Sequence, residues 1–185
     1  MVGSTGAEVK MTSKLAMEAN DKFIRDFRRH LNEVDGVSNV ILRGHLEIEG
    51  HLDMVLDLIF FRPEYLRRVR LDFSDKILLA KAYCPDPDAR EWAVIKTLNE
   101  ARNSIAHRRT TEVRTAKLAA VRQSISGFGT KAFQKDVREA DDKEVVVLAA
   151  AVASGFLAYL EDTVRSVRRV IADVLDVPEY AKAED

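Results

Sequence analysis

The sequence predicts an all-α protein, a helical bundle with an up-and-down four-helix core and additional short helices. Its 185 residues are 46% hydrophobic but only 7% aromatic, so the core is expected to consist mainly of Leu, Val, Ile and Ala. Only 8 glycines and 4 prolines interrupt the chain, which favours helix over strand. Apolar residues also recur every three or four positions through most of the long segments, as they do along one face of a helix.

Length and composition limit the organisation of the chain. We expect one domain over residues 12–176, between a disordered N-terminal segment, 1–11, and a C-terminal tail, 177–185. The formal net charge of −1 disfavours general binding of polyanions, so a nucleic acid would have to bind a local basic patch. The only cysteine, Cys84, excludes an intrachain disulfide and the usual thiolate zinc sites. The first residues resemble no secretion signal, so we expect a cytoplasmic protein.

Two long helices are predicted in the first third of the chain. The first covers Ser13–Glu33, whose apolar residues follow one face, and Asp35–Gly36 ends it as a turn. Ser38 is a candidate N-cap for the second helix, Asn39–Phe61. The apolar surface of this second helix is broad, so we expect a central helix that packs on more than one side.

A shorter helical region follows. Pro63 is expected to end the long helix, and Glu64–Val69 to form a single helical turn. Ser74 is then predicted to cap a helix over Asp75–Tyr83.

The next predicted helix has Asp86 as its N-cap and Pro87 at its first position, and it extends to the region of His107. Helical spacing divides its side chains into two opposite stripes. Arg102 lies between the stripes and is long enough to reach Asn103 and His107. One helix thus offers a cation, an amide and an imidazole to a single anionic ligand. The polar stripe consists of Lys96, Glu100, Asn103 and His107, and the apolar stripe of Val94, Leu98, Ala101 and Ile105.

The last part of the chain predicts two weaker helices, Glu112–Ser124 and Thr130–Glu139, and one long helix, Asp142–Val174. Within the long helix, Val145–Leu160 has almost no polar side chain. This apolar run is shorter than the roughly 20 residues that are needed to cross a bilayer. We therefore expect no membrane span, and a helix buried in the monomer or between subunits.

The motif Arg102-Asn-Ser-Ile-Ala-His107, at the end of the central helix, resembles the Arg-x4-His signature of the HEPN superfamily. These are small helical domains that are common in prokaryotic toxins. The wider pattern also resembles bacterial HEPN-like proteins of the mannitol operon repressor family. The segments that carry this wider resemblance are Arg43–Glu49, Leu71–Ala80 and Leu98–His107.

The resemblance implies a metal-independent endoribonuclease that needs no cofactor, with Arg102, Asn103 and His107 as catalytic residues. His107 would exchange a proton with the ribose 2′-hydroxyl or with the leaving oxygen, because imidazole changes charge near neutral pH. Arg102 would stabilise the phosphate, and Asn103 would orient His107 or the phosphate. Because cleavage needs both an acid and a base, the resemblance further implies a homodimer in which two motifs share one cleft. Such an enzyme is expected to act as a toxin–antitoxin or defence component, with a protein antitoxin as a further partner.

Other residues are candidates for supporting roles. His45 and Glu49 are four positions apart, and we interpret them as a hydrogen-bonded pair rather than a metal site, because no third ligand lies nearby. Glu49 is also a candidate for a supporting acid beside the motif. Clustered arginines are usually a solvated surface, but four of them are candidates for contact with RNA. These are Arg67, Arg68, Arg108 and Arg109.

The main alternative is a non-catalytic function. His107 would then cap carbonyl groups at the end of its helix, and Arg102 would pair with Glu100 or with an acid on another helix. The chain would be a transcriptional regulator or adaptor that resembles the mannitol operon repressor family. This alternative predicts a closed cleft, or an internal hydrogen bond at His107.

Overall fold

The computed structural model describes residues 36–107 and 110–176. The chain divides after Gly36 into two units, Met1–Gly36 and Val37–Asp185, and apart from Gly36, the first residue of α2, the helices below belong to the second. The described residues form seven helices and no strand, which confirms the predicted all-α helical bundle. The predicted N-terminal segment, the helix over residues 13–33 and the C-terminal tail lie outside the described residues. The single domain over 12–176 therefore stays a prediction.

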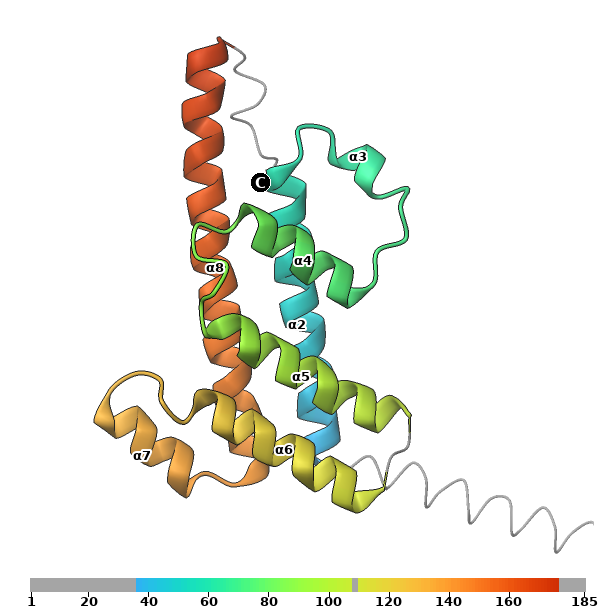
Figure 1. Cartoon of the computed structure of the whole chain (residues 1–185), viewed down its shortest axis with the longest axis vertical. Helices are drawn as coiled ribbons and strands as arrows, with labels where there is room; N and C mark the ends of the chain where they lie inside the picture. Colours follow the sequence, from blue (N-terminus) through green and yellow to red (C-terminus); the bar gives the residue numbers. More distant parts are fainter. Residues whose placement is uncertain (1–35, 108–109, 177–185) are drawn as a thin grey trace, which may run out of the picture. The chain divides into compact units, whose positions relative to one another are not determined.

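The two longest helices, α2 (Gly36–Ile59) and α8 (Asp142–Leu175), run parallel to each other (Figure 1). They approach closely at Gly44, where an added Cβ would lie 3.1 Å from the Cβ of Ala150. Near their C-terminal ends, Arg168 Nη1 donates a hydrogen bond of 2.9 Å to the carbonyl oxygen of Leu58. This arginine satisfies carbonyl groups that the end of α2 leaves without an intrahelical donor.

The central helix of the sequence prediction is α5 (Glu91–Ala106), which packs against α6 (Thr111–Ile125) and α8. The predicted apolar stripe lies in the core, where Val94, Leu98 and Ala101 are buried. On the polar stripe, Glu100 accepts a hydrogen bond of 2.8 Å from Lys117 of α6. The 3.6-residue period therefore predicted correctly which side of α5 faces the core.

The shorter helices are α3 (Pro63–Leu66), α4 (Phe73–Tyr83) and α7 (Lys131–Glu139). α4 is tied to α2 by Lys76, whose Nζ lies 2.9 Å from Glu49 Oε1 and 2.8 Å from Asp53 Oδ1. Figure 1 shows α4 and α5 crossing the direction of α2. This crossing brings the start of α4 and the C-terminal part of α5 to the same side of the unit.

Three predicted helix starts are wrong. α2 begins at Gly36, and Ser38 is buried inside it, where its hydroxyl accepts a hydrogen bond of 2.8 Å from Arg114. α4 is capped by Asp72 rather than Ser74, since Asp72 and Asp75 exchange backbone-to-carboxylate hydrogen bonds of 2.9 and 3.0 Å.

The start of α5 was predicted at Pro87, but the helix begins at Glu91. The carboxylate of Asp86 accepts a hydrogen bond of 3.2 Å from the backbone N–H of Asp88. This local bond closes a turn within residues 86–90, so the chain enters the helix one turn later than the proline suggests.

α8 is long and apolar enough, by length and composition alone, to cross a membrane, a test that core helices of soluble proteins also pass. About a third of its most apolar stretch is buried inside the protein. One face, which includes Val146 and Leu157, lies in the core as expected. Tyr159, Val170 and Val174 are exposed on other parts of the helix.

Candidate functional site

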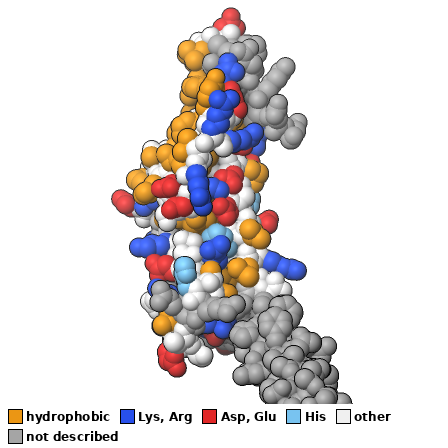
Figure 2. All heavy atoms as spheres, turned by 90° about the vertical axis from the view of Figure 1, so that its right-hand side faces the viewer, with side chains coloured by type: hydrophobic (Ala, Val, Ile, Leu, Met, Phe, Trp, Pro, Cys, Tyr) orange, Lys and Arg blue, Asp and Glu red, His pale blue; other side chains and the backbone are white. Residues whose placement is uncertain are grey.

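A polar cavity of about 310 Å³ lies between α2, the first turn of α4 and the C-terminal half of α5. We call it the His45 cavity. Figure 2 looks at this side of the unit and shows imidazole side chains at the surface among basic and acidic groups. The residues that form the cavity are His45, Glu49, Asp72, Phe73, Ser74, Asn99, Arg102 and Asn103.

His45 forms one wall of the cavity and is only 7% exposed. Its imidazole stacks at a tilt on the ring of Phe73, with 4.3 Å between the ring centroids. Its Nε2–H donates a hydrogen bond of 3.1 Å to Asn99 Oδ1. Because this bond places the proton on Nε2, the neutral ring has its lone pair on Nδ1.

The surroundings of His45 lower its pKa below the ordinary value of 6.5. Burial is the main cause, because it disfavours the charged imidazolium. The hydrogen bond with Asn99 and the charge of Glu49 raise the pKa, and the positive charges of Arg102 and Lys76 lower it, so burial decides the net direction. His45 is therefore a neutral imidazole at pH 7.

Glu49 does not form the predicted hydrogen bond with His45. The distance from His45 Nδ1 to Glu49 Oε2 is 3.9 Å, which is too long for a hydrogen bond. Glu49 pairs instead with Lys76, whose pKa is raised. Burial by itself lowers this pKa, but the hydrogen bonds and attraction of Asp53 and Glu49 outweigh it.

Within the described residues, no group of three His, Cys, Asp or Glu side chains is arranged to hold a metal ion.

Arg102 supplies the positive charge of the cavity. Its Nη1 donates a hydrogen bond of 3.2 Å to Asn103 Oδ1, as its position on the helix predicted. No carboxylate among the described residues forms an ion pair with Arg102. The pairing with Glu100 that the non-catalytic alternative considered is absent, since Glu100 pairs with Lys117. A guanidinium with this environment is available to an anion that enters the cavity.

His107 lies outside the cavity, at the residue that caps the C-terminus of α5. Its backbone N–H donates a hydrogen bond of 3.0 Å to the carbonyl oxygen of Asn103. Its side chain is exposed, and the imidazole has no hydrogen-bond partner in the described part of the chain. The imidazole of His107 is therefore accessible to a substrate in solution, whereas that of His45 is enclosed.

No family model, curated protein or solved structure matches this chain. A function is therefore inferred from the chemistry of the site.

Arg67 and Arg68, two of the arginines predicted to contact RNA, do not line the cavity. Arg67 Nη2 forms a salt bridge of 2.6 Å with Asp57, and the guanidinium of Arg68 lies 5.1 Å from the ring centre of Tyr65. Arg108 and Arg109 lie outside the described residues.

The sequence interpretation did not include two residues that shape the cavity, Asn99 and Phe73. Asn99 lies four positions before Asn103, so a search of the polar stripe for amides at helical spacing would have found it. Phe73 carries no such signal, because its contact with His45 depends on how α4 packs against α2.

Proposed function

We propose that this protein is a metal-independent endoribonuclease of the HEPN type. One observation carries the proposal. Arg102 faces an open polar cavity without a carboxylate partner in the described residues, and the exposed imidazole of His107 follows at the end of the same helix. The end of one helix thus carries the two kinds of group that cleavage of a phosphodiester requires, a cation and an accessible imidazole.

In the proposed reaction, the ribose 2′-oxygen attacks the adjacent phosphorus while the bond from phosphorus to the 5′-oxygen breaks. One His107 accepts the 2′-hydroxyl proton, and a protonated imidazole donates a proton to the leaving 5′-oxygen. Arg102 binds the non-bridging oxygens and stabilises the extra negative charge of the transition state. The products are a 2′,3′-cyclic phosphate and a 5′-hydroxyl.

His45 has a positioning role in this proposal. Its Nε2–H is held by Asn99, its ring is held by Phe73, and its lowered pKa makes it a poor carrier of protons at pH 7. It forms part of the cavity wall and holds the side chain of Asn99 there.

The reaction needs two imidazoles in different protonation states, but the motif of one chain contains only one, that of His107. We therefore propose a homodimer in which the two copies of the motif face one shared cleft. The second His107 then supplies the acid when the first acts as base. A toxin–antitoxin or defence role, with a protein antitoxin, is the setting that the resemblance suggests for such an enzyme.

One feature of the described residues favours cleavage over a non-catalytic regulator or adaptor. The alternative predicts a closed cleft between the two motifs, or an internal hydrogen bond at His107. The imidazole of His107 is exposed and has no such bond among the described residues.

The experiment is an assay of RNA cleavage by the purified protein in excess EDTA, with analysis of the product ends. We expect cleavage with 2′,3′-cyclic phosphate ends, and no cleavage of DNA of the same sequence, which lacks the nucleophile. Arg102→Ala should lower the rate by about 10²- to 10³-fold. Arg138→Ala, a change of an exposed arginine at the end of α7, is the matched control and should leave the rate unchanged. Equal rates for the two variants, or no cleavage by the unaltered protein, would refute the proposal.

A further inference from the structure

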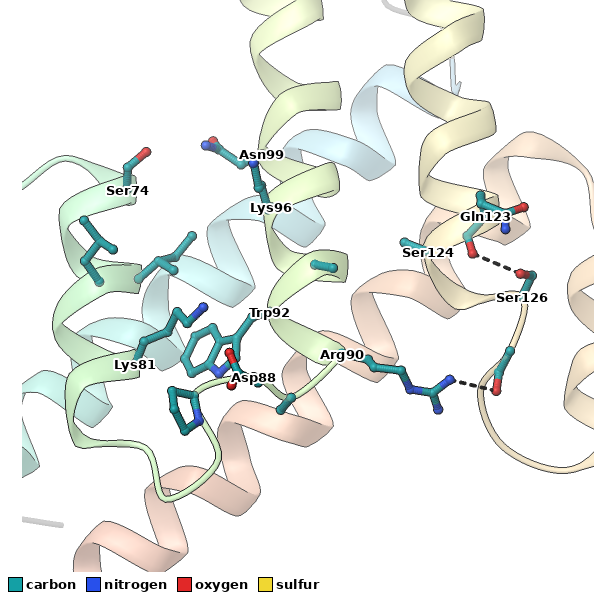
Figure 3. Close-up of a pocket in the computed structure, with 16 residues that line it drawn as sticks. Ser74, Lys81, Asp88, Arg90, Trp92, Lys96, Asn99, Gln123, Ser124 and Ser126 are labelled. Carbon is teal, nitrogen blue, oxygen red and sulfur yellow. Dashed lines mark hydrogen bonds between the residues drawn. The ribbon is translucent and has the colours of Figure 1, made fainter.

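A second and larger hollow adjoins the His45 cavity. It has a volume of about 890 Å³ and lies over α5, between α4 on one side and the end of α6 on the other (Figure 3). We call it the α4–α6 groove. Ser74 and Asn99 line both the groove and the His45 cavity, so the two hollows adjoin at these residues. Figure 3 shows these two residues together at one end of the groove.

The walls of the groove combine apolar surface with positive charge. Ile77 and Leu78 of α4 form an apolar wall, and Leu78 is 65% exposed, which is unusual for a large aliphatic side chain. Lys81 extends from α4 toward α5, and Lys96 lies on α5 itself (Figure 3). Asp88 is the one carboxylate of the lining among the described residues. The groove is thus locally basic in a chain whose formal net charge is −1.

The groove also contains hydrogen-bonding groups. Gln123 and Ser124 line its far side (Figure 3). Trp92 also contributes to the lining, although it is almost fully buried, and its indole N–H has no acceptor within the described residues. A buried donor of this kind calls for an acceptor from water or from a ligand. A nucleobase has apolar faces and a polar edge, so it matches a groove with both kinds of wall.

We propose that the α4–α6 groove binds the single-stranded RNA that flanks the phosphate held by Arg102. A base lies against Ile77 and Leu78, and Lys81 and Lys96 contact the backbone phosphates of the neighbouring nucleotides. The inference rests on the proposed ribonuclease function, since it assigns the substrate's flanking nucleotides to a place next to the cleavage site. It further restricts the substrate class to RNA that is unpaired at the cleaved position, because a base inside a duplex is not free to enter the groove.

Trp92 makes the test direct, because it is the only tryptophan of the chain and lies in the groove. The probe is a 2′-O-methyl oligoribonucleotide of about six nucleotides, which cannot be cleaved because its 2′-oxygen is blocked. We expect its titration to change the fluorescence of Trp92. The same titration should show that Lys81→Ala and Lys96→Ala each weaken binding by roughly two- to fivefold, as for other exposed charge contacts.

Two control variants keep the comparison specific. Lys135→Ala removes an exposed lysine of α7 that does not line the groove, and Leu46→Ala truncates an exposed leucine of α2 that matches Leu78 in exposure. Both should leave binding unchanged, whereas Leu78→Ala should weaken it. Binding that is insensitive to Lys81, Lys96 and Leu78, or the absence of any binding, would overturn the inference.

The binding test is separate from the cleavage test. If the oligonucleotide occupies the groove but RNA is not cleaved, the proposed function is wrong and the groove remains a site for single-stranded RNA. If RNA is cleaved while the groove variants bind and cleave as the unaltered protein does, only the inference fails.

Discussion

The two histidines of the site differ in environment: His45 lies in the wall of the cavity, and His107 lies outside it at the end of α5. His45 is 7% exposed, stacks on Phe73 and donates a hydrogen bond to Asn99. His107 is exposed at the end of α5 and has no side-chain hydrogen bond among the described residues. The first is held in one orientation and kept neutral, whereas the second is exposed to solvent.

The difference separates two functions that histidine combines in many active sites. A buried imidazole with a lowered pKa stabilises the shape of a cavity, but it gains and loses protons with difficulty near pH 7. An exposed imidazole contributes little to folding, but it is available for proton transfer. We therefore expect stability to depend on His45 and chemistry to depend on His107.

The largest expected difference in stability is between alanine variants of these two residues. His45→Ala removes a buried ring, its stacking and its hydrogen bond, so the free energy of unfolding should fall by about 2–3 kcal/mol. His107→Ala changes an exposed side chain, so the free energy of unfolding should change by less than about 0.5 kcal/mol. Urea denaturation followed by circular dichroism measures both values. Similar losses for the two variants would show that the contrast in burial has no energetic consequence.

A second comparison concerns the two asparagines of the site. Asn99→Ala leaves the buried Nε2–H of His45 without its acceptor, which should cost about 1–2 kcal/mol of unfolding free energy. Asn103→Ala removes only the half-exposed bond to Arg102, so its cost should be below about 1 kcal/mol. Equal costs in the same denaturation assay would mean that Asn99 does not hold His45 in solution.

A smaller effect is expected on the pH dependence of stability. Because the pKa of His45 is lower in the folded protein than the ordinary 6.5, the unfolded chain binds this proton more tightly. The contribution of neutral His45 is therefore complete above about pH 6.5, and it decreases as the pH falls from that value through the folded pKa. His45→Gln should lose this part of the pH dependence, and His107→Gln should keep it. Denaturation midpoints between pH 5 and pH 8 provide the measurement.

Local sequence pattern predicted the part of the site that lies on one helix. The place of Arg102 between the two stripes and its length indicated that it reaches Asn103, and the period of α5 indicated that Val94 and Leu98 face the core. Such relations depend only on the geometry of a helix. They hold wherever the helix packs.

The rest of the site depends on tertiary packing that the pattern does not contain. His45 and Asn99 are 54 residues apart in the chain, and they meet because α2 and α5 cross. The prediction also paired Glu49 with His45, its neighbour on the helix, although Lys76 of α4 is a stronger partner. The misplaced start of α5 has a local cause, since the turn closed by Asp86 competes with the helix that Pro87 favours.

The central claim is that His107, and not His45, transfers protons during RNA cleavage. The most direct test is to compare the cleavage rates of His107→Ala and His45→Gln at pH 7 in EDTA, after circular dichroism has established that both are folded. We expect His107→Ala to lower the rate by about 10²- to 10⁴-fold, as for the loss of a positioned acid–base group. We expect folded His45→Gln to retain the rate within about tenfold. The amide of glutamine can still donate a hydrogen bond and so can position its neighbours, although it cannot transfer protons as an imidazole does. Full activity of His107→Ala, together with inactive but folded His45→Gln, would contradict the claim and assign the chemistry to the buried imidazole.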